Sequence, residues 1–182
     1  EDIKQYIPAT LELSLVTITV TAILGVTLGI ISALRKDELI DNITRVTSMT
    51  GVATPSFWLA LLLQIVFYGI LGILPVRGRL SLHTMLYNPV TSITGFYFID
   101  TLLTGNWVAF RDVLVHLILP ATALSYRGIA RVIRITRSSV LDVISQDYVR
   151  TARACGISER KVVYSYILKN ALIPIVTIIG FI

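Results

Sequence analysis

The stretch TLELSLVTITVTAILGVTLGIISAL, residues 10–34, decides the fold class. It runs for 25 residues and its only charged residue is Glu12. An α-helix rises 1.5 Å per residue, so about 20 residues cross a hydrocarbon core of about 30 Å. The β-branched residues would suit a strand, but a run of this length without turn signals favours a helix. The stretch therefore predicts a membrane-spanning helix.

Further apolar runs follow, and together they predict an all-α, polytopic membrane helical bundle. Residues 52–74 form the second expected span, with Pro55 near its start, where a missing N–H costs little. Residues 113–135 form the third, and Pro120 should kink it. The last run, 171–182, covers only about 18 Å at 1.5 Å per residue. We therefore expect the chain to end inside a fourth span and to be the middle of a longer subunit.

Composition and charge placement agree with a membrane protein. The chain is 54% hydrophobic and 15% charged, whereas soluble domains are about 25% charged. Its net charge of +5 could suggest nucleic acid. However, nine of the 16 basic residues lie within 127–169 and three within 35–45, beside apolar runs, which is the positive-inside pattern. We expect no nucleic-acid partner, with 35–51 and 136–170 inside and the N-terminal end outside.

The polar region of residues 75–112 is expected to form an outer loop between the second and third spans. It is rich in Gly, Asn, Thr and aromatic residues. Aromatic side chains of this kind suit a cap at the membrane interface.

Two sets of residues inside the expected spans leave alternatives open. Gly25 and Gly29 form a small-xxx-small pair, which lets another helix approach closely, or they are incidental membrane glycines. Arg127, Arg131 and Arg134 share one face near the cytoplasmic end of the third span, where they snorkel to headgroups or contribute to a substrate site.

The segment of residues 136–170 shows a helix, a turn and a second helix. One apolar stripe repeats every four residues and predicts a helix over 139–155: Val140, Ile144, Tyr148 and Ala152. Gly156 supplies the stop, because glycine takes the left-handed conformation cheaply. Ser158 is a candidate N-cap for a helix through 161–169, with Glu159 at its positive end. Such a loop could lie on lipid headgroups or dock a cytoplasmic partner.

The stretch QDYVRTARACGISERKVVYSYILKNALIPIVT, residues 146–177, resembles the cytoplasmic loop of permease subunits of binding-protein-dependent ABC importers. The general family pattern is E-A-A-x3-G-x9-I-x-L-P, and only Ala152, Gly156 and Leu168 match it. The dipeptide, oligopeptide and nickel branch is closer, with D-Y-[VI]-R-T-A-R-A-x-G and then N-A-L-x-P-[IV]-V-T. The runs RITRSSVLDV (134–143), LPVRGR (74–79) and TGFYFIDTLLTGN (94–106) also resemble that branch.

The resemblance implies a type I ABC importer permease of the prokaryotic inner membrane, with six spans in the whole subunit. One span would precede residue 1 and one would follow the last run. The loop helix would be a coupling helix seated in a groove of a cytoplasmic ATPase. Its implied contact residues are Asp147, Tyr148, Arg150, Thr151, Ala152, Gly156 and Leu168. Arg150 and Thr151 replace the usual Glu and Ala, so contacts made by that Glu are not expected here.

The resemblance also implies partners and a cargo. The partners are a homologous second permease subunit, two cytoplasmic ATPase subunits, the lipid bilayer and an extracytoplasmic substrate-binding protein that meets the outer loop. The cargo would be di- or oligopeptides, or nickel. The chain has no G-x-x-x-x-G-K-[ST] loop, so ATP hydrolysis is expected on partner subunits, and neither an enzyme activity nor a cofactor is expected.

Two other functions remain as alternatives. His83 and His116 could be a nickel-binding pair or ordinary polar residues, and the sole cysteine, Cys155, adds no metal motif. An ion-coupled secondary transporter would normally carry acidic groups at mid-membrane. Residues 52–74 and 113–135 contain no Asp or Glu, and Glu12 lies near an outer boundary, which disfavours that class.

Overall fold

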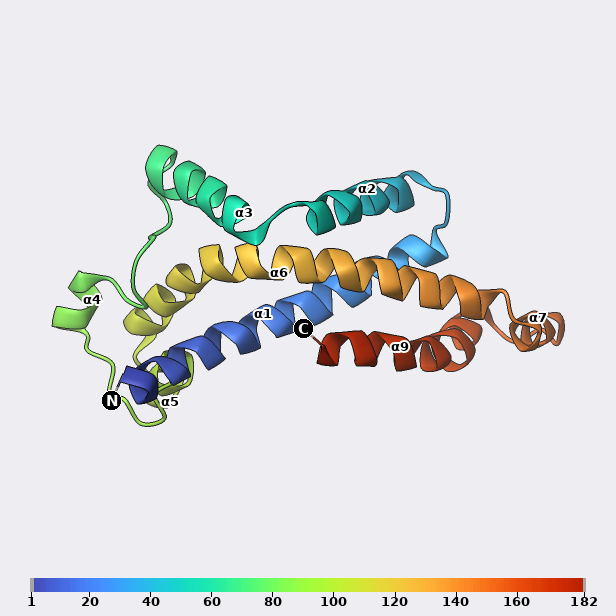
Figure 1. Ribbon diagram of the computed structural model, residues 1–182. Coiled ribbons are helices and arrows are strands. Elements are labelled where there is room, and N and C mark those ends of the chain that lie inside the picture. Colours follow the sequence, from blue (N-terminus) through green and yellow to red (C-terminus); the bar gives the residue numbers. More distant parts are fainter. Residues whose placement is uncertain (1, 182) are drawn as a thin grey trace. The chain divides into compact units, whose positions relative to one another are not determined.

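The computed structural model describes residues 2–181, which form helices and loops without a strand (Figure 1). The all-α prediction is therefore confirmed. In chain order the elements are α1 Asp2–Leu34, α2 Leu39–Ala53, α3 Ser56–Leu63, the π-helix η1 Gln64–Ile70, α4 Leu82–Tyr87, α5 Tyr97–Leu103, α6 Trp107–Ile144, α7 Asp147–Ala154, α8 Glu159–Lys161, the π-helix η2 Val162–Leu168 and α9 Lys169–Gly180.

Within residues 2–181, three continuous helical stretches are long and apolar enough to cross a membrane. They are Tyr6–Leu34, Trp107–Ile144 and Glu159–Gly180. A fourth crossing exists if Leu39–Ala53 and Ser56–Ile70 together count as one broken span.

The second expected span, 52–74, is shorter in the structure because proline and glycine bound it. Thr54 is extended, with φ −80° and ψ 122°, and α3 begins only at Ser56. A residue before proline avoids the helical region because the proline ring clashes with it. At the other end the π-helix stops at Ile70, and Gly72 takes a left-handed φ of 64°.

The last span begins earlier than its apolar run suggests. We expected it from residue 171, after a separate helix, but one helical stretch runs from Glu159 through η2 into α9. Residues 159–170 contain no proline, so each of them has a backbone N–H that can be hydrogen-bonded in the helix. The polar pair Lys169 and Asn170 therefore does not interrupt it.

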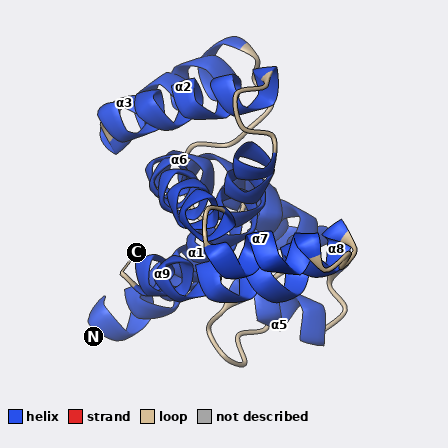
Figure 2. Cartoon of the chain, turned by 90° about the vertical axis from the view of Figure 1, so that its right-hand side faces the viewer, coloured by secondary structure: helices blue, strands red, loops and turns tan. Residues whose placement is uncertain are grey.

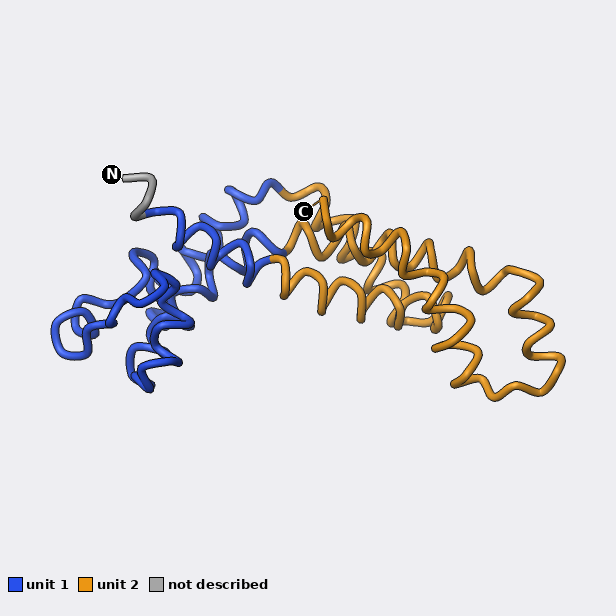
Figure 3. The backbone as a smooth tube through the Cα atoms, turned by 90° about the horizontal axis from the view of Figure 1, so that it is seen from below, with its two compact units in different colours: residues 1–17, 55–125 blue, residues 18–54, 126–182 orange. Residues whose placement is uncertain are grey.

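The chain divides into two compact units, each described separately (Figure 3). Unit 1 comprises residues 1–17 and 55–125. Its small core consists of Leu80, Ala109 and Val113, with Tyr97 and Phe98 among the side chains packed against it. This core joins the loop after η1 to the first turns of α6.

Unit 2 comprises residues 18–54 and 126–182, and within it α1 and α6 pack very closely. A Cβ added at Gly25 would lie 2.7 Å from the Cβ of Val132, and one at Gly29 would lie 2.6 Å from the Cβ of Thr136. Real side chains do not approach so closely, so only glycine fits. The structure thus decides for close helix approach over incidental glycines.

Unit 2 also contains an ion pair between α2 and α6. Asp41 is fully buried and accepts hydrogen bonds from Nε and Nη2 of Arg137, at 2.7 and 2.8 Å. Its carboxylate also accepts from Ser32 Oγ and from the Asp37 amide. A buried charge needs such partners, because an unpaired carboxylate in a low-dielectric interior is very costly.

Candidate functional site

The predicted single helix over 139–155 is wrong, because the structure breaks it at Ser145 and Gln146. The Gln146 side-chain amide donates to the Asp142 carbonyl at 3.2 Å, and Ser145 Oγ donates to the same carbonyl at 2.8 Å. In a continuing helix the Asp142 carbonyl would accept from the backbone N–H of Gln146. The two side chains take the place of that donor. Gln146 is then extended, with φ −72° and ψ 147°, and α7 starts at Asp147.

The break changes which residues of α7 are buried. Val149 is 0% exposed and Ala152 is 5% exposed, whereas Tyr148, which the stripe placed inside, is 41% exposed. Val149 and Ala152 pack in a cluster with Val162 and Ile167 of η2. The four-residue stripe therefore holds for Ala152 but not for Tyr148, because the new helix is rotated relative to α6.

Gly156 ends α7 as predicted, with a left-handed φ of 74°. The Gly156 amide donates to the Arg153 carbonyl at 3.0 Å, and the Ile157 amide donates to the Ala152 carbonyl at 3.2 Å. These two bonds form a Schellman motif. Ile157 also packs against the apolar cluster, which is the hydrophobic contact that usually accompanies this motif.

Helices α7 and α8, which are labelled in Figure 2, are joined across the glycine turn by an ion pair. Arg153 donates from Nε and Nη2 to the two carboxylate oxygens of Glu159, at 3.1 and 2.6 Å. Ser158 occupies the predicted N-cap position, but its side chain makes no cap hydrogen bond. Glu159 instead holds the turn through its bidentate contact with Arg153.

A third contact ties α7 to the start of α9. The side-chain amide nitrogen Nδ2 of Asn170 donates to Tyr148 Oη at 3.0 Å and to the Tyr166 carbonyl at 2.8 Å. Together with the cluster and the ion pair, it fixes α7 on the helix that follows. The sequence signal for Arg153–Glu159 is a pair of opposite charges flanking a glycine. Asn170 opens the branch motif N-A-L-x-P, but that motif does not indicate its contact with Tyr148.

The structure divides the implied contact residues into two groups. Ala152 and Leu168 pack in or against the loop's own cluster. The others are at the surface of the loop: Asp147, Tyr148, Arg150, Thr151 and Gly156. Arg150 lies 3.7 Å from Asp147, and both side chains are largely exposed, at 72% and 97%, so this ion pair is weak and leaves the arginine available to a partner.

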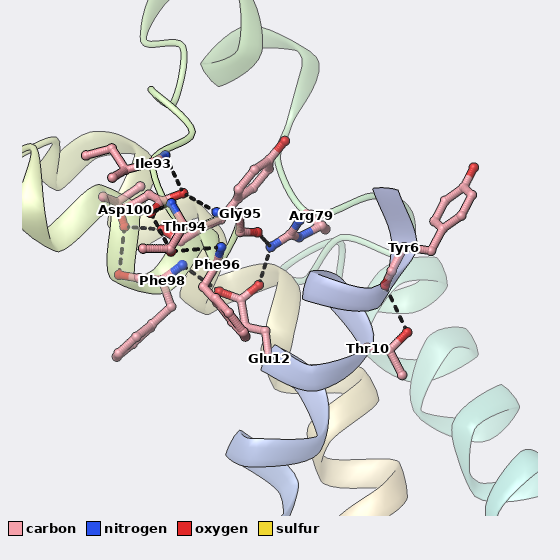
Figure 4. Close-up of polar contacts among 12 residues, drawn as sticks. Tyr6, Thr10, Glu12, Arg79, Ile93, Thr94, Gly95, Phe96, Phe98 and Asp100 are labelled. Carbon is pink, nitrogen blue, oxygen red and sulfur yellow. Dashed lines mark hydrogen bonds and ion pairs between the residues drawn. The ribbon is translucent and has the colours of Figure 1, made fainter. Parts of the chain in front are cut away.

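The second candidate surface is the region of residues 75–112 in unit 1, which carries α4 and α5. Figure 4 shows the Asp100 carboxylate with the residues of this region that surround it, Ile93, Thr94 and Gly95. Asp100 is fully buried and accepts hydrogen bonds from the amides of Ile93, Thr94 and Gly95, at 2.9 to 3.2 Å, and from Thr94 Oγ1 at 2.7 Å. Burial alone would raise the pKa of this carboxyl, but these bonds together lower it below its ordinary value of 3.8.

Glu12 of α1 is part of the same surface (Figure 4). It is 5% exposed and accepts from Arg79 Nη2 at 2.6 Å and from the Phe98 amide at 2.5 Å. Arg79 also donates to the Gly95 carbonyl at 3.1 Å and lies 3.7 Å above the Tyr97 ring. Glu12 is thus held as a structural anchor within unit 1.

The two histidines have separate local partners. The rings of His83 and Tyr87 lie 4.8 Å apart, and Nδ1 of His116 lies 2.8 Å from the carbonyl oxygen of Asp112. In the part of the chain that the structure describes, no three His, Cys, Asp or Glu side chains are grouped to hold a metal.

Comparison with known proteins connects this geometry to a transport family. Residues 25–182 match the family described as the binding-protein-dependent transport system inner membrane component. The chain is 43% identical, over 99% of its length, to a probable D,D-dipeptide transport system permease protein of Escherichia coli K12, of which it covers 52%. It is 44% identical, over 95% of its length, to a di/tripeptide transport system permease protein of Pseudomonas aeruginosa, covering 50% of that protein.

A more distant relative is named for a different cargo. The chain is 36% identical, over 99% of its length, to a putrescine export system permease protein of Escherichia coli K12, of which it covers 56%. The chain thus spans about half the length of the curated relatives that it matches.

Proposed function

We propose, from the premise that this chain belongs to the family of binding-protein-dependent transport system inner membrane components, that it helps to form the transmembrane pathway of an ATP-driven peptide importer. Within that family it falls in the dipeptide branch of ABC importer permeases, in the inner membrane. Its energy source, cargo and partner subunits are the proposed part.

The observation that carries the proposal is the braced loop of unit 2. Helix α7 buries Val149 and Ala152 against η2 and presents Arg150 and Thr151 outward. The loop lies in sequence between two stretches that are long enough to span a membrane, Trp107–Ile144 and Glu159–Gly180. A helix fixed in this way suits a docking element that passes a partner's movement to the spans.

The mechanism follows from that arrangement. Closure of two cytoplasmic ATPase subunits on ATP would displace α7, and the displacement would reach α9 through the apolar cluster and the Tyr148–Asn170 contact. The spans would then alternate between inward and outward access as a rigid-body switch. Its free energy would come from the different affinity of the two ATPase arrangements for ATP.

A pull-down tests the docking step. The full-length permease should capture its ATPase, and Arg150→Glu and Tyr148→Asp should each weaken capture, because both side chains are exposed on α7. Gly156→Pro should weaken it by removing the amide that bonds to Arg153. Ser165→Ala, at an exposed position in the following π-helix, is the matched control. Unchanged capture in all three variants would refute the coupling role.

Uptake into vesicles identifies the energy source. With the assembled complex in liposomes, uptake should require ATP in the ATPase compartment and should persist without a proton gradient. Uptake that runs on a proton gradient without ATP would instead support the ion-coupled secondary transporter.

The cargo and the remaining partners are proposed from the relatives' names and from the outer surface of unit 1. We propose di- or oligopeptides as cargo, with residues 75–112 meeting a substrate-binding protein and a homologous permease completing the pathway. Stimulation of ATP hydrolysis by binding proteins loaded with dipeptide, oligopeptide, nickel or putrescine tests this assignment. Stimulation only by the nickel-loaded or putrescine-loaded protein would contradict the peptide assignment.

A further inference from the structure

A cavity in unit 2 is lined by three arginines of α2 and α6. Its volume is about 260 Å³, many times the roughly 10–15 Å³ needed to hold one water molecule. Arg45, Arg134 and Arg137 line it, together with Asp142 and the apolar side chains of Met49 and Leu141. Charged and apolar groups therefore share one hollow.

The charges around this cavity are unequal. Arg137 is committed to Asp41, while Nε of Arg45 lies 3.9 Å from the same carboxylate and its side chain is 44% exposed. No described carboxylate lies within ion-pair distance of Arg134. The charged lining residues are the three arginines and Asp142, and Arg137 also interacts with the charges of Asp41 and Asp37 outside the lining. Arg134 is thus the arginine of the lining that no described ion pair neutralises.

The apolar side of the cavity continues along the surface of α2. Exposed side chains follow helical spacing on one face of this helix: Leu39, Ile43 and Val46. At 100° per residue, Met49 lies between that face and the side that carries Arg45. Met49 is itself 71% exposed while lining the cavity. A ligand seated there would meet arginines at one end and a hydrocarbon-compatible surface at the other.

We infer that this cavity binds the phosphodiester headgroup of an anionic phospholipid from the inner leaflet, with its acyl chains along α2. The inference rests on the proposed orientation, which puts residues 35–51 and 136–170 at the cytoplasmic face. Guanidinium groups pair with phosphate oxygens in a forked geometry, and basic pockets between spans on that face suit anionic headgroups. One phosphodiester would supply the ion-pair partner that Arg134 lacks.

Native mass spectrometry of the full-length permease in its assembled complex tests the site. The probes are phosphatidylglycerol and phosphatidylcholine, added at equal concentrations. We expect retention of phosphatidylglycerol over phosphatidylcholine, and about fivefold weaker retention in Arg134→Gln, since one basic residue near an anionic surface contributes about a factor of five. Arg134→Lys should keep most of the binding. Arg127→Gln, an exposed arginine of α6 outside the cavity lining, should change nothing.

A photoactivatable phosphatidylglycerol provides an independent readout that does not depend on a variant. Its cross-links should fall on peptides containing residues 45–49 or 133–142. Cross-links confined to other helices would overturn the inference, as would equal loss of lipid in Arg127→Gln and Arg134→Gln.

Displacement of the lipid by glycerol 3-phosphate or inorganic phosphate at matched concentration would also overturn it, because the cavity would then take a soluble anion. A chemical cross-link formed in the native complex between an acidic protein segment and the cavity residues would overturn the inference as well. ATPase capture by the same variants separates the two proposals: lipid loss with normal capture leaves the coupling role intact.

Discussion

At the scale of single residues, the buried carboxylate of Asp41 connects three segments of unit 2. It accepts hydrogen bonds from Ser32 at the end of α1, from the Asp37 amide in the following turn and from Arg137 of α6. Asp37 itself takes a left-handed φ of 66°, which turns the chain so that its amide points at the carboxylate. The turn between α1 and α2 is thus shaped around one negative charge.

Removing only one partner of this ion pair should be strongly destabilising. Arg137→Met would leave Asp41 buried without its bidentate partner and with only the 3.9 Å contact to Arg45 as an ion pair. Breaking a buried pair in this way costs about 3–5 kcal/mol. Thermal unfolding of the full-length permease in detergent would measure the loss.

The double variant Asp41→Leu/Arg137→Met should recover most of that stability, because it removes both buried charges. Arg45→Gln should cost little, since Arg45 lies 3.9 Å from Asp41 and is 44% exposed. A loss in Arg45→Gln equal to that in Arg137→Met would contradict this account.

Within the described structure, Gly156 is needed for its backbone conformation and not for lack of space. A Cβ at this position would meet nothing within 4 Å, yet φ is 74°. Gly156→Ala should therefore destabilise the turn by about 1–2 kcal/mol, the usual cost of a left-handed L-residue. Gly156→Asn should cost less, because asparagine tolerates this region. Faster hydrogen exchange at residues 147–157 would show the effect, and Gly69→Ala, with open space and no positive φ, is the control.

At the scale of elements, the packing of α1 on α6 depends on small residues at the contact. Gly29→Ala would place a Cβ 2.6 Å from that of Thr136 and 3.0 Å from the Ile133 carbonyl oxygen. Such overpacking usually costs about 1–3 kcal/mol. We expect a lower melting temperature for the full-length permease, with Gly69→Ala unchanged. An unchanged melting temperature in Gly29→Ala would show that the helices separate easily.

The loop held by Asp100 should depend on pH only in acid. Its pKa is lower in the folded state than the ordinary value of 3.8, so its stabilisation is fully present above that value. The stabilisation is lost as the pH falls through the lower, folded-state pKa. Hydrogen exchange at the amides of Ile93, Thr94 and Gly95, corrected for intrinsic rates, should stay constant from neutral pH down to about 5 and rise only in stronger acid.

Asp100→Asn is the matched variant for that experiment. It should exchange faster at neutral pH, since hydrogen bonds to a charged group contribute about 1.5–3 kcal/mol each, and should lose the acid dependence. An acid dependence that survives the substitution would assign it to another carboxylate.

Helical spans and the Gly156 stop were predictable from the sequence because they depend on local patterns: apolar length and backbone freedom. The helix boundaries at Thr54 and Glu159 were less predictable from the sequence. A proline-bounded break and a helix that continues through charged residues look alike in a hydropathy profile. The break at Gln146 was not predicted, because it depends on side chains satisfying the Asp142 carbonyl. Val149 replaced Tyr148 in the cluster for that reason.

At the scale of the whole molecule, the proposed membrane orientation can be tested with one native thiol. Cys155 is exposed and is the only cysteine of the chain. A membrane-impermeant maleimide should label it in inverted vesicles and leave it unlabelled in intact spheroplasts. In a Cys155→Ser background, a cysteine at the exposed position Ser92 should show the opposite pattern. Labelling of both positions from one side would refute the orientation.

Long-range pairs were beyond sequence reasoning at this scale. Asp41 and Arg137 are 96 residues apart, and Glu12 and Arg79 are 67 apart. Their charges are visible in the sequence, but no local spacing connects them. The family resemblance assigned contact residues to α7, and it did not distinguish Ala152, which packs internally, from Arg150, which faces outward.

The bracing of α7 has a mechanical consequence. The Arg153–Glu159 pair links α7 to α8, the Tyr148–Asn170 contact links it to α9, and the apolar cluster packs it against η2, α9 and Val140 of α6. Between α6 and α7 the helical backbone is interrupted at Ser145 and Gln146, whose side chains bond to the Asp142 carbonyl. Residues 145–146 are therefore the point at which the helical backbone can bend between α6 and α7. A force applied at Arg150 should move α7 together with η2 and α9, and should change the packing of this group on Val140.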